Sequence, residues 1–155
     1  MSLPAERQAS RQPVTGVYAL ALLLAITLFY GHTIILFDVA GALLEHRVRL
    51  QDALGFHNAG KLIVTACFVI LLATHIAEAL LWALFLRWRR LVCGFGEGLY
   101  FTAVTFTTLG YGDVTLAAPW RQLGPLLAIA GVLSFGCSTA FLFVVMQGVW
   151  TLELG

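Results

Sequence analysis

The stretch Thr107-Thr108-Leu109-Gly110-Tyr111-Gly112-Asp113 decides how this chain folds. It continues an apolar, threonine-rich run, Leu99 to Leu109, that is about 11 residues long. Crossing the hydrocarbon of a bilayer takes about 20 residues of helix, so this run predicts a short helix that enters the membrane and turns back. The glycines of the stretch end that helix, because glycine adopts backbone conformations that residues with a Cβ avoid.

The start of the short helix is marked by Gly94, Gly96, Glu97 and Gly98. Glu97 stands where a carboxylate favours a helix N-terminus, because the dipole places partial positive charge there. Concentration of cations near a pore mouth is an alternative role for the same carboxylate.

The composition is that of a membrane protein. Of 155 residues, 60% are hydrophobic and 11% are charged, and the mean hydropathy is +0.90, which soluble domains do not show. Nine basic and eight acidic residues nearly cancel, which gives no electrostatic reason to expect nucleic acid as a partner. The three cysteines, Cys67, Cys93 and Cys137, lie too far apart for a metal or redox motif, so we expect them to pack as small apolar groups and expect no cofactor.

Three further stretches are long and apolar enough to span a bilayer. They cover about 14–37, 62–86 and 123–149. A polar tail at 1–13 precedes them, and 38–60 carries charges that exclude it from the hydrocarbon. This segment is predicted to be a polar loop, with a short interfacial helix inside it as an alternative. The expected fold is an all-α integral membrane protein with three transmembrane helices and one re-entrant helix.

The central stretch resembles the selectivity-filter signature of potassium channels, whose usual core is Thr-Val-Gly-Tyr-Gly, with Leu109 in place of the valine. The resemblance extends beyond the filter to the two-helix channel family. It implies a pore domain at 61–150, made of an outer helix, a pore helix at 97–107, a filter at 108–113 and an inner helix at 121–149. The helix at 14–37 has no counterpart in that minimal unit and is expected to be additional.

A potassium ion that enters a narrow filter loses its water, so the wall must offer oxygens in its place. The resemblance implies that main-chain carbonyls supply them, with the Thr108 hydroxyl as the innermost ligand and the Leu109 and Tyr111 side chains turned away behind the filter. Potassium is then the permeant ligand. A single pore loop supplies one wall, so a homotetramer is expected. The expected ion-binding residues are Thr108, Leu109, Gly110, Tyr111 and Gly112.

Residues next to the filter are expected to support it. In some family members a glutamate of the pore helix pairs with the aspartate after the filter, but Val104 stands at that place here. Asp113 therefore needs another partner, and the hydroxyl of Tyr100 is the candidate. Thr107, at the end of the pore helix, completes this set.

The inner helix contains a glycine where family members carry a gating hinge, namely Gly131. A bend at Gly131 and close helix packing at Gly131 are equally compatible with the sequence. On the same alignment Val132, Phe135 and Thr139 are expected to face a water-filled cavity.

His75 and Glu78 lie three residues apart on one face of the second span. An ionisable pair at membrane depth predicts either a proton-sensitive brace between the outer helix and the pore helix or a structural hydrogen bond. His32 and Asp38, in or just after the first span, are expected to be packing or interfacial groups.

No span carries the regularly spaced arginines of a voltage sensor, and no nucleophile, base and oxyanion constellation indicates an enzyme. The leading function is a potassium-selective channel, with no voltage sensor and no cytoplasmic ligand domain. A non-selective cation channel, a potassium-transporter subunit and a non-conducting membrane scaffold or sensor remain alternatives. The stimulus for opening is not encoded in any recognisable motif.

The expected location is the inner membrane of a bacterium, with lipids as surroundings. With the filter facing outward, three basic residues fall inside and six outside, which reverses the usual charge bias. The three are Arg47, Arg49 and Lys61, and the six are Arg7, Arg11, Arg87, Arg89, Arg90 and Arg121. An inverted pore loop would restore the bias, but we retain the outward filter because the filter resemblance is contiguous and specific.

Overall fold

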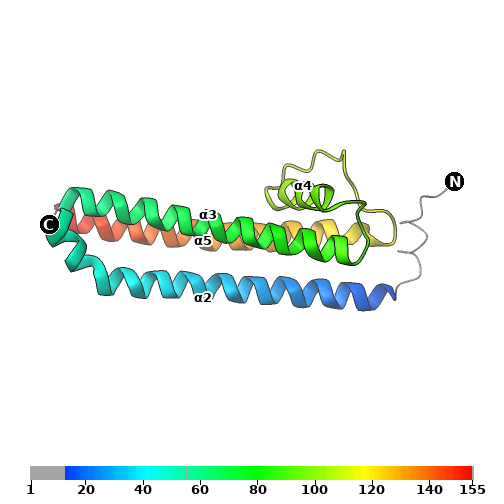
Figure 1. Cartoon of the computed structure of the whole chain (residues 1–155), viewed down its shortest axis with the longest axis horizontal. Coiled ribbons are helices and arrows are strands. Elements are labelled where there is room, and N and C mark those ends of the chain that lie inside the picture. The colour runs from blue at the N-terminus through cyan, green and yellow to red at the C-terminus, as the bar shows by residue number, and fades with distance from the viewer. Residues whose placement is uncertain (1–12, 55, 155) are drawn as a thin grey trace. The chain divides into compact units, whose positions relative to one another are not determined.

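Helices form the regular structure of the described chain. The computed structural model describes the backbone of residues 13–54 and 56–154, and their side chains except at 44, 47–54, 56–58 and 152–154. In chain order the elements are α2 (Val14–Leu54), α3 (Phe56–Trp88), α4 (Phe95–Phe106), a 3-10 turn (Trp120–Gln122) and α5 (Leu123–Leu154) (Figure 1). The prediction of an all-α fold is confirmed.

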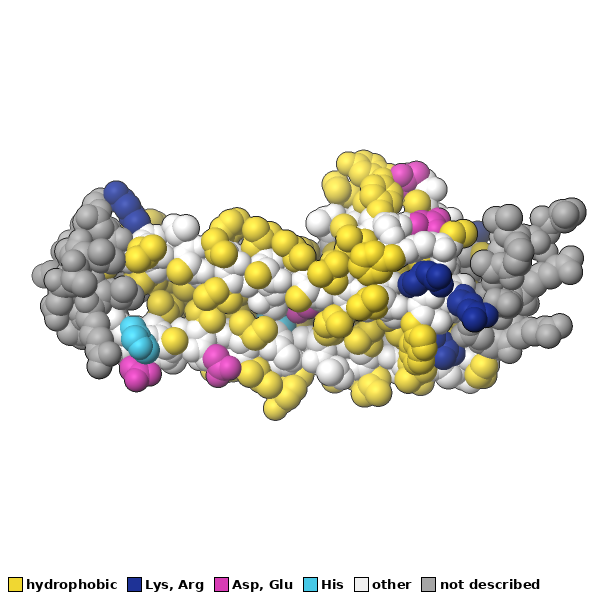
Figure 2. All heavy atoms as spheres, in the orientation of Figure 1, with side chains coloured by type: hydrophobic (Ala, Val, Ile, Leu, Met, Phe, Trp, Pro, Cys, Tyr) yellow, Lys and Arg dark blue, Asp and Glu magenta, His cyan; other side chains and the backbone are white. Residues whose placement is uncertain are grey.

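Three of these helices contain segments that are long and apolar enough to cross a membrane. The segments are Val14–Leu43, Ala59–Trp88 and Trp120–Thr151. Hydrophobic side chains are exposed along the described helices (Figure 2), as lipid contact requires. With its 12 residues, α4 is too short to span the bilayer, which matches the predicted re-entrant helix.

The prediction of a polar loop at 38–60 is wrong, because most of this segment is helical. α2 continues to Leu54 and α3 begins at Phe56, although the apolar segments end at Leu43 and resume at Ala59. Charge keeps a segment out of the hydrocarbon, but it does not prevent helix formation, and the Glu, Arg, Leu and Gln residues here favour helix. The predicted polar tail lies outside the described residues, apart from Pro13.

The chain divides into two compact units, and the described residues of the first are 13–29 and 76–133. In it α4 packs against α3, since a Cβ added to Gly98 would lie 3.3 Å from the carbonyl oxygen of Ala83. α4 also packs against α5, since a Cβ on Gly124 would lie 3.8 Å from the Phe101 ring. The hydroxyl of Tyr18 donates to the carbonyl of Pro119 at 2.8 Å. The largest fully buried side chains of the first unit are Trp82, Leu86, Trp120, Leu123 and Leu127.

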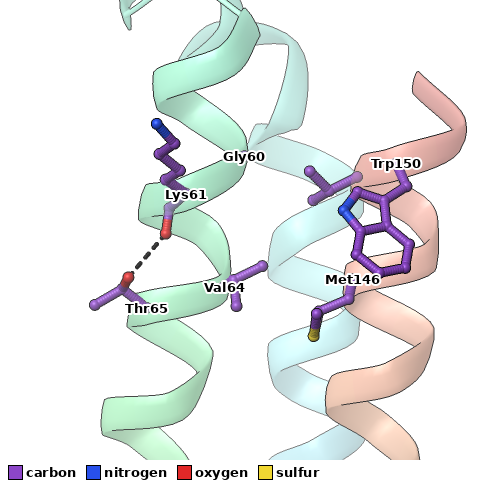
Figure 3. Close-up of a pocket in the computed structure, with 7 residues that line it drawn as sticks. Gly60, Lys61, Val64, Thr65, Met146 and Trp150 are labelled. Atoms are coloured by element: carbon purple, nitrogen blue, oxygen red, sulfur yellow. Dashed lines mark hydrogen bonds between the residues drawn. The ribbon is translucent and has the colours of Figure 1, made fainter. Parts of the chain in front are cut away.

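The second unit comprises residues 30–75 and 134–155. A pocket of about 350 Å³ lies in it between α3 and α5. Figure 3 draws Lys61, Val64, Met146 and Trp150 around this pocket, with the Thr65 hydroxyl bonded to the carbonyl of Lys61. A tryptophan and a lysine at the ends of apolar segments are typical of the membrane interface.

Candidate ion-binding site

The start of α4 is held by a contact between a side chain and the main chain. Gly94 is the N-cap residue and offers no side-chain cap. Glu97, in the first turn, accepts a hydrogen bond from the backbone N–H of Cys93 at 2.7 Å. The same carboxylate is favoured by the positive end of the helix dipole. Glu97 therefore lies in the first turn of α4, as predicted, and concentration of cations near a pore mouth stays an alternative role.

The chain leaves α4 through a tight sequence of main-chain hydrogen bonds. Thr107 is the C-cap, and its backbone N–H and its hydroxyl both donate to the carbonyl of Ala103, at 3.1 and 2.8 Å. The N–H of Thr108 donates to Thr105 at 3.1 Å, and that of Gly110 reaches back to the carbonyl of Val104 at 3.2 Å. Val104 therefore supports the following loop through its main chain, a role that its apolar side chain did not indicate.

In the loop 107–113 the backbone is left-handed at every second residue from Thr108 to Gly112. φ is +58° at Thr108, +53° at Gly110 and +79° at Gly112, whereas Leu109 and Tyr111 between them are not in the left-handed region. Alternation between the two hands turns successive peptide groups toward one side. No atom lies within 4 Å of a Cβ added at Gly110 or Gly112, so these positions need glycine for its conformation and not for space.

Thr108 is a non-glycine residue in this left-handed region. A β-branched side chain is strongly disfavoured there, and such a conformation costs on the order of 1–3 kcal/mol. Strain of this kind is concentrated at functional sites, where the surroundings hold the backbone in place. Thr108, which is expected to give the innermost ligand, is thus the residue of 107–113 with the most strained backbone.

Asp113, the last residue of the loop 107–113, has the predicted partner. The hydroxyl of Tyr100 in α4 donates to its Oδ2 at 2.6 Å, and its Oδ1 accepts the backbone N–H of Val114 at 3.0 Å. The bond from Tyr100 lowers the pKa of Asp113, and the same bond raises the pKa of Tyr100. The contact ties the C-terminal end of the loop to α4.

The side chains between the left-handed positions are exposed in the single chain. Leu109 is 57% exposed and Tyr111 is 67% exposed. They were expected to pack behind the filter, and one chain alone does not cover them. Large apolar groups left open in this way need either lipid or another chain as a neighbour.

Gly131 lies against α4. A Cβ at Gly131 would fall 2.8 Å from the Cα of Phe106 and 2.9 Å from its carbonyl oxygen, which no real Cβ tolerates. α5 is one continuous helix from Leu123 to Leu154. Of the two roles open for Gly131, close packing of helices is the one that these distances support.

The three residues expected to line a cavity do not share one environment. Val132 is 52% exposed and Thr139 is exposed on α5. Phe135 is half-buried, and its ring lies 4.2 Å from the ring of His75 in α3, measured between centroids. All three stay predicted cavity-lining residues, and the ring of Phe135 in addition contacts His75 of α3.

The ring of His75 makes a polar contact as well. Its Nε2 lies 3.0 Å from the hydroxyl of Ser138 in α5, so His75 contacts the inner helix, a contact that was not predicted. His32 of α2, expected to be a packing or interfacial group, places its Nε2 2.9 Å from the same hydroxyl. Ser138 was not anticipated, although a polar residue inside the apolar run of 123–149 was the available signal. Glu78 is buried one turn beyond His75.

The cysteines differ among themselves. Cys67 is buried, as expected, whereas Cys137 is half-buried and Cys93, just before α4, is exposed. Packing as a small apolar group therefore does not describe Cys93.

Comparison with known proteins identifies the class. Residues 65–148, more than half of the 155, match the model of the family described as "Ion channel". A search of curated proteins gives no match. A search of solved structures gives none. The matched region begins within α3 and ends within α5, so it includes α4 and the loop after it.

The molecule is therefore a membrane-spanning channel protein. The chain belongs to the two-transmembrane pore-domain ion channel family, with α2 as an additional N-terminal helix.

Proposed function

We propose that this ion channel subunit forms a potassium-selective pore as one of four identical copies. The main-chain oxygens of residues 108–112 hold dehydrated potassium, which is the permeant ligand, and the proposal includes no cofactor. The observation that carries the proposal is the left-handed backbone at Thr108, Gly110 and Gly112.

Alternation of backbone hand matters for selectivity because it aligns successive peptide groups, so that the loop presents carbonyl oxygens along one side, as in potassium filters. Such a row replaces the water shell of an ion at several successive levels. The hydrogen bonds from Gly110 to Val104 and from Tyr100 to Asp113 hold the loop at its middle and at its outer end. A held loop keeps its oxygens at the spacing that suits one ion size.

Fourfold assembly follows from the same loop. One chain supplies one wall of a pore, and closed rings of oxygens need identical copies around an axis. The exposed side chains of Leu109 and Tyr111 offer apolar surface for the neighbouring copies to cover. The C-terminal end of α4 carries partial negative charge, which favours a cation near the inner end of the loop.

Ion flux from proteoliposomes tests the proposal. Vesicles loaded with potassium are expected to release it through the purified protein, whereas vesicles loaded with sodium retain theirs. Gly110→Ala should abolish the release, because Gly110 has a φ of +53°. Gly96→Ala is the matched control, since a Cβ there meets no atom within 4 Å and its φ is not left-handed. Equal release of sodium and potassium would instead identify a non-selective cation channel.

A further inference from the structure

A polar cluster, buried at His32 and Ser138 and half-buried at His75, joins three helices in the second unit. The Nε2 atoms of His32 (α2) and His75 (α3) lie 2.9 and 3.0 Å from the hydroxyl oxygen of Ser138 (α5). The two imidazole rings lie 5.1 Å apart between centroids. His32 is 1% exposed and Ser138 is 5% exposed. All three residues belong to segments able to cross the membrane, where ionisable groups are rare and usually functional.

Because both imidazole rings contact the same hydroxyl, the protonation of each ring determines whether it donates or accepts a hydrogen bond. A serine hydroxyl donates one hydrogen bond and accepts others. With both rings neutral, one imidazole accepts the hydroxyl hydrogen of Ser138 and the other donates its N–H to the oxygen. When one ring gains a proton, both rings donate to the oxygen, and the hydroxyl hydrogen turns to another acceptor, as helix serines do toward the carbonyl four residues back. One proton is thus accepted without loss of either contact.

A second proton is not accepted in the same way. Two imidazolium rings 5.1 Å apart repel each other, and the low dielectric of the membrane interior strengthens the repulsion. The charged groups nearby are few. Glu78, one turn beyond His75 on the same face of α3, supplies one negative charge. The sequence has no other charged residue in 14–37 of α2, in 62–86 of α3 or in 123–151 of α5. A second proton therefore leaves net positive charge at membrane depth.

We propose that His32, His75 and Ser138 form a proton-binding site that regulates the channel. The site holds α2, α3 and α5 together while the two histidines carry at most one proton, and it releases α5 when they take up a second. Phe135, whose ring packs on His75, and Ser138 both belong to α5, so the change acts on the predicted inner helix. Acidification is expected to increase potassium flux; this part rests on the proposed function, whereas the binding of protons does not.

Proton binding is tested directly by NMR of purified protein labelled with ¹⁵N-histidine, titrated over roughly pH 5 to 8, where histidine ordinarily changes charge. The expected result is two separated titration steps for His32 and His75, with a single step left in His32→Gln or His75→Gln. His46, which is exposed, provides the reference for an independent histidine. Simultaneous titration of His32 and His75 like His46, or the absence of titration in this range, would overturn the proposal.

Regulation is tested by potassium flux from proteoliposomes at pH 7.5 and pH 5. Flux is expected to rise about fivefold on acidification, at the low end of usual coupling between sites. His32→Gln and His75→Gln should abolish this rise, whereas His46→Gln should keep it. A full rise in both cluster variants would overturn the regulatory role. If the wild-type protein passes no ion at either pH, the proposed function fails, and the NMR titration still decides whether the proton site exists.

Discussion

This channel subunit has two polar regions of opposite kinds: one consists of exposed main-chain groups, and the other of side chains packed between helices. The loop 107–113 is exposed and presents main-chain groups, ordered by left-handed backbone at every second residue from Thr108. The cluster of His32, His75 and Ser138 is buried except at His75, which is half-buried, and it joins side chains of three helices. A main-chain ligand does not titrate, so the loop depends on backbone conformation. A side-chain cluster containing histidine depends on protons. Each region should therefore respond to changes that leave the other unaffected.

The largest expected effect comes from a Cβ placed on the left-handed backbone. Gly112 has a φ of +79° with no atom within 4 Å of an added Cβ, so Gly112→Ala acts through strain alone. Strain on the order of 1–3 kcal/mol per subunit, repeated around the proposed fourfold pore, should reduce potassium flux at least about tenfold. Flux from proteoliposomes measures the change.

Gly96→Ala should change the same flux less than about twofold, since its Cβ also meets no atom and the helix gains propensity. If Gly112→Ala conducts as well as Gly96→Ala, conduction does not depend on the left-handed backbone conformation of the loop. The pH response of whatever flux remains in Gly112→Ala should be that of the wild type, because the buried cluster is unchanged.

A smaller effect is expected where α5 meets α4. Gly131→Ala places a Cβ 2.8 Å from the Cα of Phe106, and overpacking of this kind typically destabilises by about 1–3 kcal/mol. Gly136→Ala is the matched control on the same helix, because a Cβ there meets no atom within 4 Å. Thermal unfolding of both variants in detergent gives the comparison. A Gly131→Ala variant as stable as Gly136→Ala, yet unable to conduct, would restore the hinge interpretation.

The Tyr100 to Asp113 contact gives a moderate, pH-dependent effect in the loop. The bond lowers the pKa of Asp113 below its ordinary 3.8, so its stabilisation is complete above that value and is lost as the pH falls through the lowered pKa. In Tyr100→Phe the carboxylate takes up its proton at a higher pH. Loss of potassium selectivity on acidification should therefore begin at a higher pH in Tyr100→Phe than in the wild type.

Tyr18→Phe is the control for this contact, since it removes a hydroxyl that donates to Pro119 and leaves Asp113 unchanged. Identical acid profiles for Tyr100→Phe and Tyr18→Phe would mean that the Asp113 contact does not hold the filter.

Membrane orientation is tested by labelling a cysteine that the protein already has, so the effect expected on the protein itself is the smallest. Cys93 is exposed just before α4, whereas Cys67 is buried. With the filter outward, a membrane-impermeant maleimide added to intact cells should label Cys93, and Cys93→Ser should abolish the labelling. Labelling of Cys93 only after the cells are opened would establish the inverted loop that the distribution of arginines favours.

The parts of the structure that sequence predicted well are those that depend on neighbours along the chain. The motif at 107–113, the short helix before it and the contact of Tyr100 with Asp113 all lie within about 20 residues of one another. Local conformational preference places the helix and its end, and the family resemblance, with Val104 at the usual place of a glutamate, led to Tyr100 as the partner of Asp113.

The errors arose where distant segments or competing preferences decide. Hydropathy placed 38–60 outside the hydrocarbon but did not reveal that α2 continues through it to Leu54, because charged helix formers are compatible with helix in water. His75 was identified, yet its partner Ser138 lies 63 residues away, and nothing in either local sequence indicates the other. The role of Gly131 likewise depended on its distance from Phe106.

The central claim is that main-chain oxygens of the loop select potassium, and a bi-ionic reversal potential tests it most directly. The purified protein is placed in a planar bilayer with potassium on one side and sodium on the other. The current is predicted to reverse far from zero, at the sign that potassium permeation gives, and to do so equally at neutral and acidic pH above the titration of Asp113. A reversal near zero, with sodium carried as readily as potassium, would contradict the claim.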